Sequence, residues 1–261
     1  MWISHFIIKH LKIDEFTLQS CADRSWIDMM RSLLTVEHIS NALDIGCGGG
    51  IYSKALADMG VQTVIGIDFS EPILEGAKEN CKDYKNISFQ LGNAYDTGLE
   101  SQSFQLVIER ALIHHLRDLL ACFKEAHRLL KDGGVFIIQD RTPDDCLLEG
   151  DNTNIRGYLF ELFPKLIEKE IKRRHSSQTV IEALQEAGFK KIEEVKLWEI
   201  RKVHENKAQL LKDISERTGR SILYELDDQE LSLLADYVQK KVTKENNIVE
   251  KDRWTIWKAT I

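Results

Sequence analysis

Short apolar runs alternate with amphipathic stretches along residues 42–140. The runs are rich in Val, Ile, Leu and Phe and predict strands buried on both faces. They lie at 42–45, 61–67, 87–91, 104–108 and 135–139. The stretches between them repeat apolar residues at helical spacing and predict helices at 52–59, from 70 onward and at 116–130. This order predicts an α/β fold with a mainly parallel sheet covered by helices on both faces.

The pattern differs on either side of this segment. The first forty residues have helical spacing, and Trp26 is expected to pack in a core there rather than to contact a substrate. After Pro143, helical spacing returns in 143–176, at 180–187 and in 203–250. Residues 190–200 and 253–261 predict two further strands. We therefore expect one domain over residues 1–261, with a core at 41–142 and helical insertions at 143–176 and 203–250.

Charge and cysteine content narrow the class of protein. The 42 acidic and 35 basic residues give a net charge of −7, which argues against a nucleic-acid partner. No apolar run is long enough to cross a bilayer, and polar residues interrupt the apolar N-terminus, so we expect neither a membrane anchor nor a signal peptide. Five scattered cysteines without a CxxC pair predict no disulfide framework and no metal site, and favour a cytoplasmic location.

The motif that predicts chemistry is Leu-Asp-Ile-Gly-Cys-Gly-Gly-Gly at 43–50. A strand that ends in glycines before a helix lets a ligand approach the backbone closely. Asp44 adds an acceptor there, and Asp68 ends the next strand, where an acid suits the hydroxyl groups of a ribose. A dinucleotide fingerprint needs a third glycine or an alanine where this chain has Ile51, so a nicotinamide cofactor fits poorly.

Residues 42–140 resemble the class I S-adenosylmethionine-dependent methyltransferases of the small-molecule type. The resemblance rests on ALDIGCGGG (42–50), VIGIDFS (64–70), GNA (92–94), SFQLVIER (103–110), HHL (114–116) and EAHRLLKDGGVFIIQD (125–140). It implies a Rossmann-like sheet of seven strands, the last one antiparallel. It further implies that S-adenosylmethionine is the cofactor, that S-adenosylhomocysteine is its product, and that the N-terminal helices form part of a lid.

The resemblance also assigns cofactor-binding residues. Gly46 and Gly48, with Asp44 nearby, would face the methionine part of the cofactor. Cys47 lies between the two glycines and belongs to the same binding set, although its side chain is more typical of packing than of a nucleophile. Asp68 would hold the ribose.

The remaining cofactor contacts implied by the resemblance follow strands two to four. Phe69 would pack beside the adenine. Asn93 stands where the family often has Asp and would reach the adenine amino group, while the Ala94 N–H would serve a ring nitrogen. Arg110 would line the methionine end of the cofactor.

Methyl transfer is an in-line displacement in which positioning contributes most of the rate. A base is needed only when the acceptor must lose a proton. His114 and His115 are the candidate catalytic bases by residue type, and Glu109 is the next. The alternative role for both histidines is to support the following helix.

Basic residues recur in the insertions. The run 165–174 and the residues Arg201, Lys202, Lys207, Lys212, Arg217 and Arg220 usually indicate a solvated helix face. Because such insertions build the acceptor pocket in this family, a basic lining there would suit an anionic acceptor, such as a carboxylate.

We expect methyl transfer to a small-molecule acceptor. One alternative is methylation of RNA or protein, although Glu109-Arg110-Ala111-Leu112 lacks the Asn/Asp-Pro-Pro-aromatic motif used on base amines. The other alternative is a regulatory protein that binds S-adenosylmethionine without turnover. The sequence leaves the acceptor, the methylated atom and the oligomeric state open.

Overall fold

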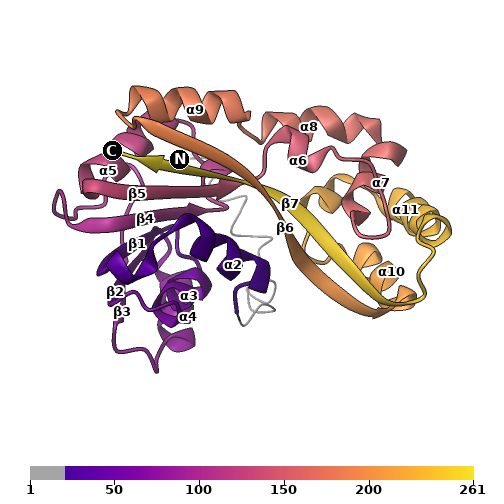
Figure 1. Ribbon diagram of the computed structural model, residues 1–261. Helices are drawn as coiled ribbons and strands as arrows, with labels where there is room; N and C mark the ends of the chain where they lie inside the picture. Colours follow the sequence, from indigo (N-terminus) through magenta and orange to yellow (C-terminus); the bar gives the residue numbers. More distant parts are fainter. Residues whose placement is uncertain (1–20) are drawn as a thin grey trace.

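A seven-stranded sheet is the framework of the protein (Figure 1). The computed structural model describes residues 21–261, so the first half of the helical lid expected over residues 1–40 lies outside the described residues. The strand order is β3-β2-β1-β4-β5-β7-β6. The strands are β1 (Asn41–Ile45), β2 (Thr63–Asp68), β3 (Ile87–Leu91), β4 (Phe104–Arg110), β5 (Leu130–Asp140), β6 (Lys191–Asn206) and β7 (Asn246–Thr260). Strands β1 to β5 are parallel, and β7 is antiparallel to both of its neighbours, as predicted.

Helices cover both faces of the sheet because successive strand residues point to opposite sides. On one face, Leu43 and Ile45 pack against α5 (Leu119–Leu129) and α9 (Ser177–Glu186). On the other face, Ala42 packs in a cluster with α2 (Arg24–Leu33) and α3 (Ile51–Asp58). Helix α4 (Glu71–Asn80) lies along β2 and β3. The period of two within β1 thus supplies both layers of the core.

Helix α2 uses Trp26 in the way the sequence predicts. The indole is buried and meets the Tyr52 ring edge-on, with 4.9 Å between the ring centroids. The Asp23 carboxylate accepts the Ser25 N–H and caps the helix. Trp26 is therefore a packing residue that ties the N-terminal side of the described chain to α3.

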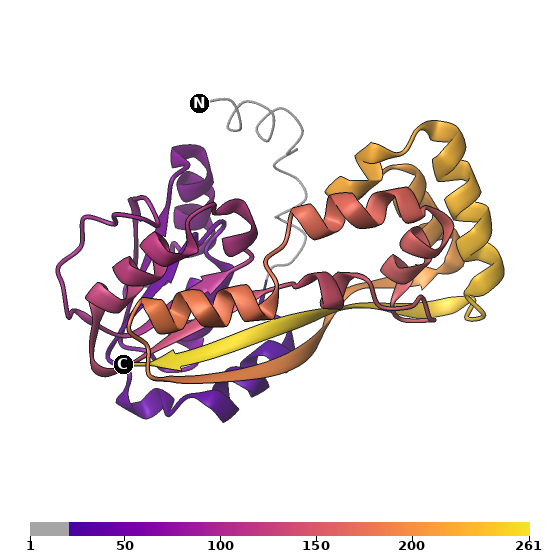
Figure 2. The ribbon, with the colours of Figure 1, turned by 90° about the horizontal axis from the view of Figure 1, so that it is seen from above.

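A second lobe is built on the far ends of β6 and β7, which run past the edge of β5 as a two-stranded ribbon (Figure 2). Its core is formed by side chains of α7 (Ile155–Leu162), α10 (Lys207–Ser215), α11 (Asp228–Lys241) and the 3-10 turn η5 (Ser221–Glu225). Helix α6 (Pro143–Cys146) leads from β5 into this lobe, and α8 (Ile167–Lys172) leads from it to α9. The register of the ribbon shifts between Ile200 and Lys202, so Arg201 is an extra residue there.

The strands of this ribbon are longer than the sequence predicts. Residues 203–206 and 246–250, expected to belong to a helical insertion, extend β6 and β7 instead. His204 and Glu250 are buried in the ribbon, and polar residues at inward positions hide the apolar alternation that marks a strand. The helix predicted to begin at a capping box of Asp227 and Glu230 is confirmed as α11.

The described residues include no helix that is both long and apolar enough to cross a membrane.

The stacked aromatic core under β5 makes a stability prediction. Phe136 is fully buried, and its ring centroid lies 5.6 Å from that of Phe123 and 5.5 Å from that of Phe189. We expect Phe136→Ala to lower the free energy of unfolding by about 3–5 kcal/mol because it leaves a cavity. Leu233, which is 57% exposed on α11, is the control, and Leu233→Ala should change it by less than about 0.5 kcal/mol. Equal losses in chemical denaturation would contradict this assignment of the core.

Candidate functional site

The carboxyl ends of the central strands meet at one edge of the sheet. Ile45 pairs with Ile67 of β2 and with Glu109 of β4, and Glu109 pairs with Ile138 of β5. The loops that follow these strands therefore lie side by side. In open parallel sheets this edge is where ligands bind.

The glycine loop after β1 leaves its backbone open to a ligand. Gly46 and Gly48 have φ of +72° and +52°, a left-handed conformation that favours glycine. The N–H groups of Gly46 and Cys47 donate to the Ile67 carbonyl, which fixes the loop on β2. A Cβ on Gly46 would lie 3.0 Å from Leu112, whereas one on Gly48 would have no atom of the described chain within 4 Å. The space beside Gly48 is thus open to a bound group.

Asp68 joins this loop to the end of β2. Its Oδ2 accepts the Gly48 N–H at 3.1 Å, and its Oδ1 accepts the Ser70 N–H at 3.0 Å. Each carboxylate oxygen has a second lone pair that a ribose hydroxyl could use. The neighbouring Phe69 is 71% exposed, so its ring is available for stacking.

Asp44 lies behind the glycine loop. Its Oδ2 accepts the Ser53 hydroxyl of α3 at 2.6 Å, and burial raises the pKa of this carboxyl to about 6. The contact ties β1 to the helix that begins after the glycines. The hydrogen bond between Ser53 and Asp44 therefore supports the shape of the glycine loop.

Asn93 and Ala94 lie after β3 on the same edge. The Asn93 side-chain oxygen accepts the Tyr95 N–H at 3.0 Å, which closes a local turn, and Asn93 itself is exposed. Ala94 is half-buried. Their proposed contacts with adenine stay predictions.

Arg110 is clamped between two aromatic rings. Its guanidinium lies 4.2 Å from the Tyr52 ring centroid and 4.4 Å from that of Trp254. It also donates to the Glu199 carboxylate at 2.6 Å, and Gln139 donates to the other oxygen of that carboxylate at 2.7 Å. Arg110 thus joins β4, α3 and both strands of the ribbon at the wall of the site.

His114 is held by a buried carboxylate that the sequence marks only as the end of a strand. His114 belongs to the 3-10 turn η3 (Ile113–His115), and its Nδ1 lies 2.8 Å from Asp140 Oδ2. Asp140 also accepts the Arg141 N–H at 2.7 Å and the Arg174 guanidinium at 3.1 Å. Although burial alone would raise the pKa of Asp140, His114 and Arg174 hold it well below its usual range. A carboxylate on Nδ1 leaves Nε2 as the basic nitrogen.

The two other candidate bases have different surroundings. The His115 ring lies beside that of His114, with 4.0 Å between centroids, and is more exposed. The buried Glu109 carboxyl accepts the Cys122 thiol of α5 at 3.1 Å. Burial raises the pKa of Glu109 to about 8. Of the three candidate bases, His114 alone has a carboxylate that orients it in the described structure. The sequence contains a signal for this pairing, because Asp140 is the last residue of β5 and β5 lies beside β4.

Comparison with known proteins finds methyltransferases among those to which this chain is similar. A family model described as a methyltransferase domain matches residues 43–138. The demethylmenaquinone methyltransferase of Staphylococcus saprophyticus is 35% identical over 118 residues, which are 44% of this chain and 50% of that protein. The demethylmenaquinone methyltransferase of Bacillus licheniformis is 28% identical over 152 residues, which are 57% of this chain and 66% of that protein. The chain thus spans about half to two thirds of these curated relatives.

Solved structures are similar over nearly the whole chain. One is a protein described as a methyltransferase from an antibiotic biosynthesis pathway of Anabaena variabilis, with a TM-score of 0.67 and 20% identity over 93% of this chain and 99% of that one. Another is phosphoethanolamine N-methyltransferase 2 of Haemonchus contortus, with a TM-score of 0.56 and 20% identity over 91% of this chain and 52% of that one. At these identities the likeness concerns the fold, and the predicted fold class is confirmed.

The buried Glu109 makes a pH prediction. A folded pKa of about 8 lies above the ordinary 4.5, so the folded chain keeps a proton that the unfolded chain releases. Stability from this group is present below about pH 4.5 and is lost as the pH rises through about 8. Relative to wild type, Glu109→Gln should therefore gain at least about 1 kcal/mol in unfolding free energy between pH 5 and pH 8.

The control for this pH experiment is Glu193→Gln, which changes an exposed carboxylate on β6. Its difference from wild type in urea unfolding should stay constant with pH. A constant difference for Glu109→Gln as well would show that Glu109 ionises in the folded protein as it does in water.

Proposed function

We propose that residues 43–138, which match a family model described as a methyltransferase domain, form a class I, S-adenosylmethionine-dependent methyltransferase domain, and that the protein transfers a methyl group from S-adenosylmethionine to a small-molecule acceptor. The observation that carries the proposal is the joint placement of the open Gly48 backbone and the Asp68 carboxylate at the carboxyl edge of the sheet. The names of the curated relatives, which act on demethylmenaquinone, support a small-molecule acceptor.

The described residues fit this cofactor. Asp68 would bind the ribose hydroxyls through its remaining lone pairs, and the exposed Phe69 ring would cover the adenine. Asn93 and Ala94 would contact the adenine edge. When bound, S-adenosylmethionine supplies a methyl group on a positively charged sulfur.

The methionine part of the cofactor would lie along the glycine loop. Gly46, Cys47 and Gly48 would offer it their backbone, since the space beside Gly48 is open. Asp44 supports this loop from behind, and Arg110 forms the wall toward β7. The chain would thus contribute mainly position, which supplies about 7–11 kcal/mol of a displacement barrier when the reacting groups are well aligned.

His114 would act where the acceptor carries a proton. Asp140 would orient the ring through Nδ1, so that Nε2 is placed to accept that proton. His115 would support this ring from the side. An acceptor without an acidic proton would need neither group.

Binding of S-adenosylhomocysteine tests the proposal. Isothermal titration of the full chain should give micromolar affinity for S-adenosylhomocysteine and no heat with NADH. Asp68→Ala should weaken the affinity at least about tenfold, because it removes hydrogen bonds to a charged acceptor. Asp83→Ala, which changes an exposed acid after α4, should bind like wild type. Binding of NADH alone, or equal binding by Asp68→Ala, would contradict the proposed site.

A further inference from the structure

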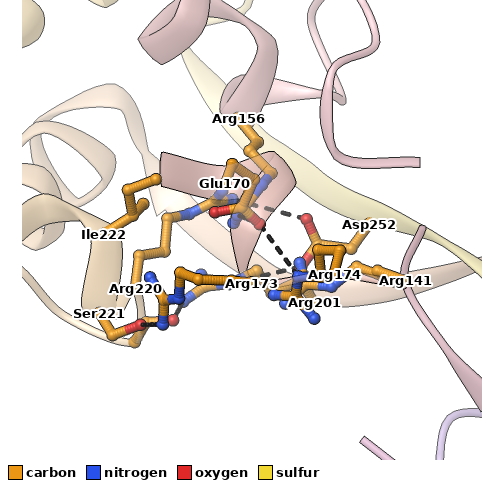
Figure 3. Close-up of a pocket in the computed structure, with 11 residues that line it drawn as sticks. Arg141, Arg156, Glu170, Arg173, Arg174, Arg201, Arg220, Ser221, Ile222 and Asp252 are labelled. Carbon is orange, nitrogen blue, oxygen red and sulfur yellow. Dashed lines mark hydrogen bonds and ion pairs between the residues drawn. The ribbon is translucent and has the colours of Figure 1, made fainter. Parts of the chain in front are cut away.

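A cluster of arginines surrounds a cavity between the sheet edge and the second lobe (Figure 3). The cavity has a volume of about 80 Å³. Six arginines line it, from the chain after β5, from α7, from the end of α8, from β6 and from the start of η5: Arg141, Arg156, Arg173, Arg174, Arg201 and Arg220. Side chains so far apart in sequence meet here because Arg141 follows β5, Arg201 lies on the ribbon that runs past this end of β5, and the other four belong to or adjoin α7, α8 and η5.

The carboxylates in contact with these arginines do not balance their charge. Glu170 accepts Arg156 at 2.7 Å and Arg174 at 3.2 Å, and Asp252 pairs with Arg141 at 3.2 Å. Glu250 pairs with Arg201 and Arg220, and Asp140 pairs with Arg174. Counting all four carboxylates against the six arginines leaves a surplus of two positive charges.

Several of these guanidinium groups have unused donors. Within residues 21–261, Arg141 Nε, Arg156 Nε and Arg220 Nη1 are buried and have no hydrogen-bond acceptor. Burial, together with the neighbouring arginines, lowers the pKa of Arg141 and Arg220. Buried cations without full pairing are costly, and an anion in the cavity would supply both the charge and the acceptors.

The cavity adjoins the proposed site of methyl transfer. Arg174 contacts the same Asp140 carboxylate that orients His114. The Arg141 guanidinium lies 4.8 Å from the centroid of the Trp254 ring, and the guanidinium of Arg110 lies 4.4 Å from the same centroid. An acceptor with one end in the cavity would therefore have its other end near the His114 ring.

We infer that this arginine pocket binds a terminal phosphate group of the methyl acceptor, an inference that rests on the proposed methyltransferase function. A phosphate monoester carries a charge of about −2 and three terminal oxygens at neutral pH. Its charge matches the surplus of two positive charges, and its three oxygens can accept hydrogen bonds from arginines on different sides of the cavity. A single carboxylate has one charge and one plane, so it would leave half of the surplus uncompensated. Arginine is the side chain best suited to such oxygens.

Inorganic phosphate is the probe for the pocket. Titrated against the full chain at constant ionic strength, phosphate should raise the Tm, whereas equal concentrations of chloride or acetate should not. Arg220→Gln should remove the effect. Arg173→Gln is a second variant in case the buried change prevents folding, since Arg173 is exposed and donates to Ser221 at 2.9 Å. The Arg173→Gln substitution should weaken phosphate binding about tenfold.

Arg217→Gln is the matched control, because Arg217 pairs with Asp228 and does not line the pocket. It should respond to phosphate like wild type. The S-adenosylhomocysteine affinity of all three variants should stay within about twofold of wild type, so failure of the pocket and failure of the methyltransferase function give separate results. Absence of a phosphate effect, an equal effect of acetate, or an undiminished effect in Arg173→Gln would overturn the inference.

A second measurement uses turnover. Formation of S-adenosylhomocysteine should be faster with phosphate monoesters of small amines and alcohols than with the same compounds lacking phosphate. Arg173→Gln should raise KM for those phosphate esters and leave kcat nearly unchanged, since it acts on a remote part of the acceptor. Faster turnover of the compounds that lack phosphate would overturn the inference.

Discussion

The buried carboxylate of Asp140 has partners from three directions, and the geometry of the site depends on them. A buried charge is stable only when hydrogen bonds and opposite charges surround it. Here they come from the His114 ring in η3, from the Arg141 N–H after β5, and from Arg174 at the end of α8. One residue thus orients the candidate base and fixes the position of the second lobe against the sheet.

The two halves of the molecule contribute different parts of the proposed reaction. The ends of β1, β2 and β3 would supply the proposed cofactor contacts, and the geometry of the first two ends is set by glycines and by the Asp68 hydrogen bonds. The ribbon of β6 and β7 and the helices on it supply the arginine pocket. Because these contributions come from separate elements, residues that choose the acceptor can differ without disturbing the cofactor half.

The sheet and the glycine loop could be predicted from sequence because their signals are local. Apolar runs mark the strands, and Gly48 and Asp68 follow two adjacent strands, so parallel pairing brings them together. Long-range pairing of charges could not be predicted in this way. Arg217 and Arg220 are equivalent in the sequence pattern, yet one pairs with Asp228 on the surface and the other is buried in the pocket. A basic residue of a buried ion pair has the same sequence pattern as one on a solvated helix face, because its acidic partner lies far away in the sequence.

The extra residue in β6 changes whether odd-numbered or even-numbered positions of this strand face inward. Before Arg201 the buried residues of β6 are at odd positions, Leu197 and Glu199, and after it the buried residue is His204, at an even position. Their partners on β7 show no such change, since Trp254, Asp252 and Ile248 are all buried. Arg201 therefore separates a segment of β6 with odd-numbered buried positions from one with an even-numbered buried position, and its own side chain lines the arginine pocket. Deletion of Arg201 would leave Ile200 and Lys202 opposite the consecutive residues Lys251 and Glu250, with His204 still facing inward, so the extra residue serves to bend the ribbon and to add an arginine to the pocket.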